Sequence, residues 1–215
     1  MSTEQTNFWR GDFGREYTDR NAPPVVEMEE AHKRRFGLTR TELNQRFLGG
    51  LDRSARILEV GCNVGMQLRV LQAMGFENLV GVELQPYAVE RAKANTSGIG
   101  ILIGSGMELP FRDNWFDLVF TSGVLIHIAP ADHSVIMNEM ARCTRRFVWG
   151  FEYYAQEIAA VNYRGHEGFL WKGDFAAIFG ANVANLSLLQ QEFYPYLTES
   201  EAGNTDSMYL LEKKV

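Results

Sequence analysis

The sequence predicts an α/β fold: a Rossmann-like, doubly wound sheet, mostly parallel, with an antiparallel pair of strands at its C-terminal edge and a helical lead-in. Two observations predict this class. From Arg56 onward, short apolar runs alternate with segments of helical spacing, which requires crossover connections and therefore parallel strands covered by helices. The tail then holds two β-favouring runs joined by a link too short for a helix, so these runs should pair antiparallel.

Residues 1–54 precede the alternating part and are rich in Arg, Glu, Asn and aromatic side chains. A pair of prolines at 23–24 indicates a break between elements in this segment. Helices are expected from Val25 to Phe36 and from Thr39 to Leu48, the second ended by two glycines. The chain is therefore divided into an N-terminal helical or lid segment, 1–54, and a second domain, 55–215.

The second domain alternates strands and helices in a fixed order. The expected strands are Ile57–Val60, Leu79–Val82, Ile99–Ile103, Phe116–Phe120 and Arg146–Phe151, followed by the tail pair Asn185–Phe193 and Met208–Leu211. The expected helices are Val64–Met74, Pro86–Asn95 and Asp132–Cys143. Pro86 suits the first helical position, because its missing N–H would have no partner there.

Charge and composition exclude several classes of protein. The 215 residues carry a formal net charge of -6, and no basic block is longer than 33–35, so a nucleic-acid partner is not expected. Cys62 and Cys143 lie far apart in apolar surroundings, which supports neither a disulfide framework nor a metal site. Residues 1–20 are polar where a secretory signal would be apolar, and no run approaches the roughly 20 apolar residues of a membrane span. We expect a cytoplasmic protein without membrane contact.

The main chemical signal is the run from Glu59 to Gly65, which lies between the first strand and the first helix of the second domain. Glycines in such a turn let the backbone approach a ligand, and the helix that follows offers free N–H groups. Glu83 ends the next strand about 20 residues downstream, where a Rossmann arrangement places the acceptor for two ribose hydroxyls. The pattern predicts a nucleotide-like ligand.

The type of nucleotide follows from the spacing of the glycines. A dinucleotide site reads G-x-G-x-x-G, but here Asn63 stands between Gly61 and Gly65, and Leu68 follows, so the fit is poor. From Arg56 to Gly150 the chain resembles class I S-adenosylmethionine-dependent methyltransferases, whose first motif commonly reads Leu-Glu-Val-Gly-Cys-Gly-x-Gly. Asn tolerates left-handed backbone angles, so the turn should be preserved.

The resemblance implies S-adenosylmethionine as cofactor and assigns most of its contacts. The turn lies beside the methionine part, and Leu84 covers the adenine. The stretch from Gly104 to Phe111 resembles the family run Gly-Asp-Ala-x-x-Leu-Pro-Phe, with Ser105 replacing the Asp that meets the adenine amino group. The segment from Thr121 to His127 resembles the family segment ending Val-Leu-x-His and is expected to pass near the sulfonium. The implied cofactor contacts are Glu59, Gly61, Cys62, Asn63, Gly65, Glu83, Leu84, Ser105, Gly106, Met107, Glu108, Ser122 and Gly123.

His127 is the candidate catalytic residue. Methyl transfer needs a nucleophile aligned about 3 Å from the methyl carbon in a dry site, and a base helps when the acceptor is a hydroxyl. His127 follows the fourth strand at the carboxyl edge, where ligands of open α/β sheets bind. The alternative is that it hydrogen-bonds the backbone at the start of the next helix. His32 and His133 are expected to be solvated helix residues.

The stretch from Phe8 to Tyr17 resembles the start of methylases associated with pseudaminic acid biosynthesis, which read Phe-Trp-x-Gly-x-Phe-Gly-x-Glu-Tyr. That resemblance implies an acidic or nucleotide-linked sugar as acceptor. Tyr17 is then a cofactor contact and Arg15 or Arg20 a carboxylate contact, unless the aromatic residues only pack against outer helices.

A second polar and aromatic cluster follows the fifth strand. From it, Tyr154, Arg164 and His166 are taken as acceptor contacts. The leading hypothesis is methyl transfer to oxygen or nitrogen of a small polar acceptor. The candidate acceptors are a nonulosonic acid and a nucleotide-linked sugar. The alternatives are an NAD-dependent oxidoreductase and a non-catalytic S-adenosylmethionine-binding module. The sequence leaves the oligomeric state open.

Overall fold

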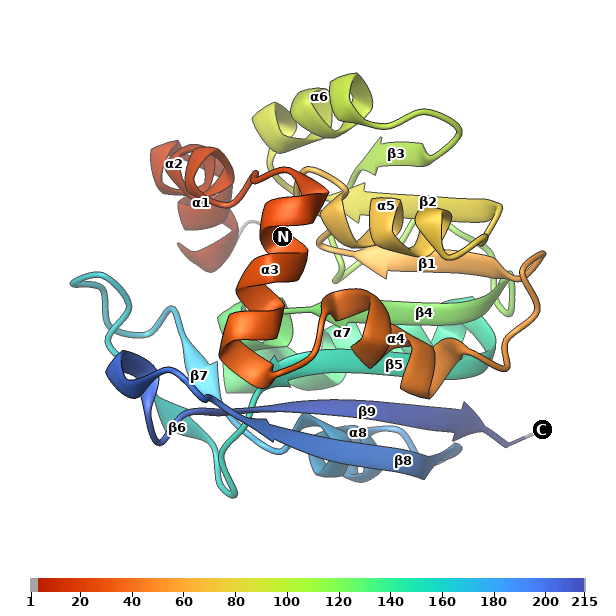
Figure 1. Ribbon diagram of the computed structural model, residues 1–215. Coiled ribbons are helices and arrows are strands. Elements are labelled where there is room, and N and C mark those ends of the chain that lie inside the picture. The colour runs from red at the N-terminus through yellow and green to blue at the C-terminus, as the bar shows by residue number, and fades with distance from the viewer. Residues whose placement is uncertain (1–3, 215) are drawn as a thin grey trace.

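The computed structural model describes residues 4–214, so the first three residues of the N-terminal segment lie outside it. A seven-stranded sheet runs through the molecule in the order β3-β2-β1-β4-β5-β9-β8 (Figure 1). Its strands are β1 (Arg56–Val60), β2 (Asn78–Glu83), β3 (Gly100–Ile103), β4 (Phe116–Ser122), β5 (Thr144–Tyr153), β8 (Leu186–Pro195) and β9 (Thr205–Lys213). β1 to β5 are parallel, whereas β9 is antiparallel to both β5 and β8, which confirms the expected fold class and edge pair.

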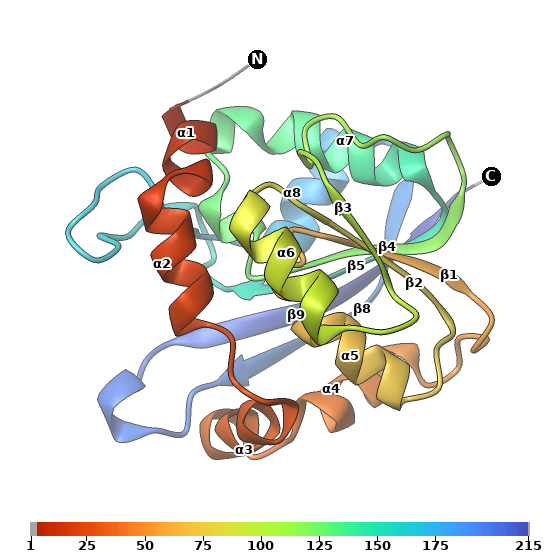
Figure 2. The ribbon, with the colours of Figure 1, turned by 90° about the horizontal axis from the view of Figure 1, so that it is seen from above.

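Helices cover both faces of the sheet. Seen from above, α7 (His133–Cys143) and α8 (Phe175–Asn182) lie on one side, while α3 (Val25–Phe36), α4 (Arg40–Leu48) and α5 (Met66–Ala73) lie on the other (Figure 2). Neighbouring strand residues alternate between the two cores: Leu58 and Val119 pack with α7 and α8, whereas Ile57 and Leu118 pack with α4 and α5. This period of two is what a sheet buried on both faces requires. α6 (Pro86–Asn95) connects β2 to β3.

Both helices expected in the N-terminal segment are present, and two further helices precede them. α3 has the expected bounds and ends at Gly37 in the left-handed conformation. α4 begins after Thr39, whose side chain accepts from the Glu42 N–H while the Glu42 carboxylate accepts from the Thr39 N–H, a complete capping box. α1 (Glu4–Arg10) and α2 (Asp12–Arg20) come before them and are joined at Gly11.

Further elements lie between β4 and β9. The short 3-10 helices η1 (Leu125–His127) and η2 (Pro130–Asp132) follow β4, and η3 (Glu199–Glu201) precedes β9. β6 (Ala159–Ala160) and β7 (Trp171–Lys172) form a separate two-stranded sheet. His133 begins α7 with only 2% of its surface exposed and contacts the Ile128 carbonyl, so the expectation of a solvated residue there is wrong.

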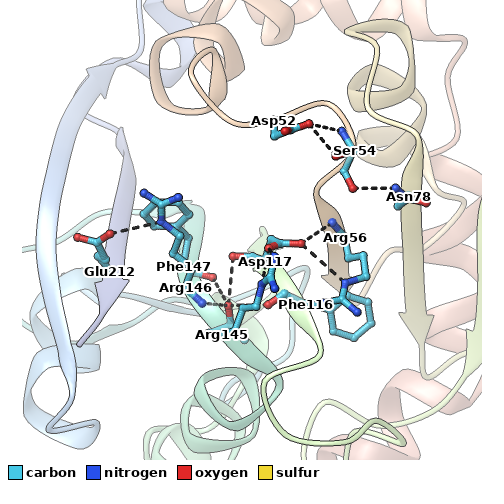
Figure 3. A network of polar contacts seen from close by, with 11 residues as sticks. Asp52, Ser54, Arg56, Asn78, Phe116, Asp117, Arg145, Arg146, Phe147 and Glu212 are labelled. Atoms are coloured by element: carbon cyan, nitrogen blue, oxygen red, sulfur yellow. Dashed lines mark hydrogen bonds and ion pairs between the residues drawn. The ribbon is translucent and has the colours of Figure 1, made fainter. Parts of the chain in front are cut away.

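Asp117 connects three strands at the amino ends of the sheet, far along β4 from its carboxyl end. Its carboxylate accepts from the Arg56 N–H at 2.8 Å and forms ion pairs with the side chains of Arg56 and Arg145 (Figure 3). The network ties β1 and β5 to β4 and has no part in the carboxyl edge. Cys62 and Cys143 are both buried thiols.

Candidate functional site

A cavity of about 450 Å³ opens at the carboxyl ends of β1, β2 and β4. This is where the strand order reverses, since β1 pairs with β2 on one side and with β4 on the other. Open α/β sheets bind ligands at such a switch point because the flanking connections diverge there and leave a crevice. The cavity extends from this crevice under the N-terminal helices.

The glycine turn, residues 61–65, forms one wall through left-handed backbone angles. Gly61 and Gly65 both have φ of 75°, and Asn63 has φ of 45°. A Cβ on Gly61 would lie 2.6 Å from Cγ2 of Val124, so the turn has no room for a side chain there. Asn63 adopts the conformation that was expected of it, and the turn keeps its shape.

Glu83 is tied to this turn. Its Oε2 accepts from the Asn63 N–H and its Oε1 from the Gln85 N–H, each at 2.8 Å. Burial raises the pKa of Glu83, and the two hydrogen bonds act against that rise. Each carboxylate oxygen has lone pairs beyond the one used here, so the group is held in place and can still accept from a ligand.

The segment after β3 forms the far wall of the same crevice. Ser105, Gly106 and Met107 line the cavity, as does Leu84. The Ser105 hydroxyl accepts from the Met107 N–H at 3.2 Å and so closes a local turn. Glu108, by contrast, is exposed and lies outside the cavity wall.

The opposite end of the crevice is acidic and incompletely paired. Glu59, the last but one residue of β1, has 2% of its surface exposed, and its Oε2 has no hydrogen-bond partner among the described residues. Burial raises the pKa of Glu59 well above its usual range, while the nearby Arg40 guanidinium lowers it. A buried carboxylate without a partner is costly, so this atom indicates room for a ligand's donor group.

The loop after β4 completes this end of the crevice. Ser122 and Gly123 line the cavity, and a Cβ on Gly123 would meet nothing within 4 Å. The buried Glu152 carboxylate accepts from the N–H groups of Val124 at 3.2 Å and Ile126 at 3.4 Å. Burial raises the pKa of Glu152 to about 7. A side chain from β5 thus fixes the loop that carries His127.

His127 lies in η1, lines the cavity and has 8% of its surface exposed. Its Nδ1 lies 2.9 Å from the carbonyl oxygen of Phe169. Because a carbonyl can only accept, Nδ1 carries the hydrogen and Nε2 the lone pair of the neutral ring. Burial lowers the pKa of His127 to about 4. The ring is therefore an uncharged hydrogen-bond acceptor at neutral pH. Its backbone partner lies in the loop before β7 and not, as the alternative expectation had it, at the start of α7.

The N-terminal cover, α1 and α2, lies across the cavity mouth. Trp9 and Tyr17 line the cavity and contact His127, with ring centroids 4.5 and 6.2 Å from it. The Gln85 side-chain amide donates to the carbonyls of residues 9, 10 and 11 at 3.2, 2.9 and 2.9 Å. Burial raises the pKa of Tyr17, so its hydroxyl stays protonated.

A second part of the cavity, the α3 arm, lies between α3 and α4 on one side and the ends of β5 and β9 on the other. Its wall is built from Met28, His32, Arg35, Phe36, Arg40, Phe151, Tyr153 and Asp206. Burial raises the pKa of Asp206 to about 7, and its Oδ1 accepts from the Tyr196 hydroxyl at 2.8 Å. Burial lowers the pKa of His32 to about 4, and its Nδ1 lies 2.9 Å from the Met28 carbonyl. The expectation that His32 is a solvated residue is therefore wrong.

The structure brings most of the expected cofactor contacts to one cavity. Those that line it are Tyr17, Glu59, Gly61, Cys62, Asn63, Glu83, Leu84, Ser105, Gly106, Met107, Ser122 and Gly123. Gly65 lies behind the turn as the N-cap of α5, where a Cβ would be 3.1 Å from Thr96. Arg20 also lines the cavity, whereas Arg15 lies over the Tyr87 ring outside it.

The expected acceptor contacts lie elsewhere. Tyr154 packs edge-on against Phe193, with centroids 4.6 Å apart. His166 contacts Phe8 and Phe13 on the outside of the N-terminal cover. Arg164 is exposed in a turn with φ of 53°. None of the three belongs to the described cavity wall.

Within residues 4–214, the side chains of His, Cys, Asp and Glu form no cluster suited to a metal ion. Over the same residues, no helix has the length and apolar character needed to cross a membrane.

Comparison with known proteins assigns the central part of the chain. Residues 58–147 match the family model described as a methyltransferase domain. Over 78 residues the chain is 31% identical to 24-methylenesterol C-methyltransferase 2 of Arabidopsis thaliana, covering 34% of this chain and 22% of that protein. It is 33% identical over 87 residues to an uncharacterized methyltransferase of Synechocystis, covering 40% and 41%. The chain thus spans only about a fifth of the length of the sterol methyltransferases that it matches.

Solved structures share the whole fold. The 1,6-didemethyltoxoflavin-N1-methyltransferase of Burkholderia thailandensis, solved with 1,6-didemethyltoxoflavin and S-adenosylhomocysteine, covers 100% of this chain and 91% of its own, with a TM-score of 0.72 and 17% identity. The [4+2]-cyclase SpnF covers 81% and 80%, with a TM-score of 0.63 and 16% identity. At these identities the likeness shows the fold.

The central segment, 58–147, is similar to methyltransferase domains, and the fold around it is the one that S-adenosylmethionine-dependent methyltransferases share. The same match and fold support S-adenosylmethionine as the cofactor.

Proposed function

We propose that this chain transfers the methyl group of S-adenosylmethionine to an oxygen or nitrogen of a small polar acceptor. The single observation that carries the proposal is the cradle formed by the glycine turn and Glu83, a carboxylate held at 2.8 Å from the turn's own N–H. In a Rossmann arrangement the carboxylate at the end of the second strand accepts from the two ribose hydroxyls, and this cradle supports that role for Glu83.

The residues of the crevice suit each part of the cofactor. Glu83 would accept from the ribose hydroxyls, and Leu84 with Met107 would cover the adenine. The unpartnered Oε2 of Glu59 supports the placement of the ammonium group at the other end. When bound, the cofactor supplies an already activated methyl group, so the protein has mainly to align the acceptor and exclude water.

The α3 arm is the proposed acceptor site. It continues from Ser122 and Gly123, beside which the sulfonium would lie, and it is walled by aromatic faces and hydrogen-bond acceptors. His127 and Asp206 face the cavity as an uncharged imidazole and a carboxyl whose pKa burial raises to about 7. Both can accept a hydrogen bond from a hydroxyl or amine and so orient its lone pair toward the methyl carbon.

The finer substrate class rests on the N-terminal run from Phe8 to Tyr17. Its resemblance to methylases associated with pseudaminic acid biosynthesis supports an acidic or nucleotide-linked sugar as acceptor. In this proposal the N-terminal cover would close over cofactor and acceptor together, since Trp9 of α1 and Tyr17 of α2 line the cavity and contact His127.

Transfer of a labelled methyl group tests the proposal. The protein would be incubated with S-adenosylmethionine carrying a labelled methyl and with panels of sugars, nucleotide-linked sugars and small amines. Label should enter one acceptor class with release of S-adenosylhomocysteine. Binding of the cofactor without transfer in any panel would instead favour a non-catalytic module or, as the fold of the cyclase SpnF illustrates, another reaction on the same scaffold.

A further inference from the structure

The far end of the α3 arm is closed by the turn between β8 and β9. In this turn the Leu197 N–H donates to the carbonyl of Arg35, in the last turn of α3, at 2.8 Å. The Arg35 guanidinium donates to both carboxylate oxygens of Glu201 in η3, at 3.1 and 2.7 Å. These contacts join the turn to α3, so a molecule that enters the arm from the crevice has to be short.

Asp206, the second residue of β9, lines this closed end with 4% of its surface exposed. Its Oδ1 accepts from the Tyr196 hydroxyl at 2.8 Å, and among residues 4–214 no other hydrogen bond reaches the carboxyl group. Burial raises the pKa of Asp206 to about 7, and the Tyr196 hydroxyl and the Arg35 guanidinium act against that rise. A buried carboxyl group with an unused oxygen is stabilised when a ligand donates to it.

Two further groups of the arm have unused hydrogen-bonding capacity. Nδ1 of His32 lies 2.9 Å from the Met28 carbonyl and carries the hydrogen, so the Nε2 lone pair of the neutral ring is left for a ligand. Tyr153 also lines the cavity, and its hydroxyl has no hydrogen-bond partner in the described part of the chain. Because His32 and the ionised Asp206 both offer acceptors, the arm favours a molecule rich in hydrogen-bond donors.

The cations of the arm do not form an anion site at its closed end. Arg35 is already paired with the Glu201 carboxylate. Arg40 lies at the opposite end, where its Nη2 donates to Oγ of Ser122 at 3.2 Å. A ligand carboxylate at the closed end would lie beside the Asp206 carboxyl group, and two neighbouring carboxylates disfavour each other's charged form. The closed end therefore selects donors over anions.

Asp206 is distant from the proposed position of the methyl group beside Ser122. Ser122 of β4 is opposite Phe151 of β5, Phe151 is opposite Met208 of β9, and Asp206 lies two residues nearer the start of β9. Neighbouring strands are roughly 4.8 Å apart, so Ser122 and Asp206 are separated by on the order of 10 Å. A hydrogen bond and the approach to the methyl carbon take about 3 Å each, which leaves the width of one six-membered ring.

Aromatic rings line the space between these two ends. Phe36 and Phe151 lie with their ring centroids 5.6 Å apart, and the His32 ring lies 5.6 Å from that of Phe36. Apolar walls with a few polar groups are typical of sites for small molecules. The faces of a small ring can pack against the aromatic side chains while its polar substituents meet Asp206 and His32.

We propose that the α3 arm binds an acceptor built on a single six-membered ring, which carries an amino or hydroxyl group opposite the methylated atom, and that Asp206 selects this group by accepting its hydrogen bond. The inference rests on the proposed function and names the class of acceptor for the same site. His127 in η1 follows β4 and meets the reacting end of the molecule, whereas Asp206 meets its distal group. Asp206 is thus a specificity-determining residue.

The test uses three cyclohexane probes that differ at one position. trans-4-Aminocyclohexanol presents an ammonium group opposite its hydroxyl, cyclohexanol presents no polar group there, and trans-4-hydroxycyclohexanecarboxylate presents an anion. Each probe is titrated at pH 7.5 into the full chain saturated with S-adenosylhomocysteine, and its NMR signals report binding. We expect the amine to bind roughly 10- to 100-fold more tightly than the other two probes, because a hydrogen bond between charged groups changes affinity by that factor.

Asp206→Asn removes the negative charge but keeps an oxygen that can accept from the Tyr196 hydroxyl. The variant should lose the preference for the amine, whereas its affinity for cyclohexanol should stay within about twofold. Its affinity for S-adenosylhomocysteine should be unchanged, which reports that the fold is intact. Asp52→Asn, at an exposed position before β1, is the matched control and should change none of these affinities.

Each other outcome has a definite meaning. A preference for the amine that survives in Asp206→Asn would overturn the inference, and so would a carboxylate probe that binds as tightly as the amine. An unaltered chain that binds S-adenosylhomocysteine but none of the probes would overturn it as well. Equal weakening of the probes and S-adenosylhomocysteine in Asp206→Asn would mean a structural role and would have the same consequence. If the unaltered chain did not bind S-adenosylhomocysteine, the proposed function itself would fail.

Discussion

The carboxylate of Glu83 accepts a hydrogen bond of 2.8 Å from the backbone N–H of Asn63, which joins the end of β2 to the turn that follows β1. The acidic group and the turn are thus one unit before any ligand arrives. Preorganisation of this kind lowers the cost of binding, because the carboxylate need not be ordered at that moment.

Replacing Glu83 with Ala should weaken S-adenosylhomocysteine binding by roughly 10- to 100-fold, since two ribose hydroxyls lose a charged acceptor. Calorimetry measures the change. Glu77→Ala, at an exposed position just before β2, is the matched control and should leave the affinity unchanged. Equal affinities of the Glu83 variant and the unaltered chain would show that the ribose is held elsewhere.

Replacing Gly61 with Ala should destabilise the fold by about 1–3 kcal/mol. Two causes act: φ of 75° disfavours any side chain, and the new Cβ would lie 2.6 Å from Val124. Urea unfolding gives the loss. Adding Val124→Ala removes the contact but leaves the backbone strain, so the double variant should recover only part of the stability. Full stability of Gly61→Ala alone would contradict the turn geometry.

Replacing Gln85 with Glu should loosen the N-terminal cover. The change keeps the side-chain oxygen that accepts from the Tyr87 N–H and caps α6, but it removes the amide that donates to three carbonyls at the end of α1. Amide hydrogen exchange over residues 4–20 should accelerate by roughly tenfold. The rest of the sheet should exchange as before. Unchanged protection of residues 4–20 would mean that aromatic packing alone holds the cover.

Replacing His127 with Asn should reduce the acid sensitivity of the fold. In the folded chain burial lowers the pKa of His127 to about 4, whereas an unfolded histidine titrates near 6.5. Between these values the unfolded chain binds one more proton, so stability falls as pH falls, by up to about 1.4 kcal/mol per pH unit.

Urea unfolding from pH 7.5 to 4 measures that slope in both proteins. The Asn side chain can still donate to the Phe169 carbonyl, and the difference at pH 7.5 reports any packing loss separately. The free energy of unfolding of the variant should fall less steeply with falling pH, by the contribution of one proton. Parallel slopes would show that His127 takes up a proton in the folded state and is more basic than its buried position implies.

Local signals made much of the fold predictable. α3 has the expected bounds and α4 begins one residue later than expected, after Thr39; the residues that end and cap them, Gly37 and Thr39 with Glu42, act within one turn of the chain. α8 begins after Asp174, whose side chain accepts from the Ala177 N–H, but the apolar run that follows this cap is too short to predict a helix by its periodicity. α1 and α2 have 7 and 9 residues and depend on tertiary contacts more than on their own periodicity.

The site was predictable where one stretch of chain builds it. The glycine turn and Glu83 stand at a spacing fixed by one strand–helix–strand unit, so sequence alone could pair them. His32, Arg40 and Asp206 come from α3, α4 and β9, respectively, and meet only after the sheet closes. Tyr154, Arg164 and His166 share the polar and aromatic composition of a binding cluster, but the loop between β5 and α8 turns them away from the cavity. The composition of a segment does not tell which way its side chains point.

A crystal structure of the chain with S-adenosylhomocysteine is the most direct test of the account. The ligand should lie over the glycine turn, with both ribose hydroxyls within hydrogen-bond distance of the Glu83 carboxylate and the ammonium group near Glu59. A ligand bound elsewhere, with Glu83 still bonded only to Asn63 and Gln85 and the crevice above the turn empty, would contradict it.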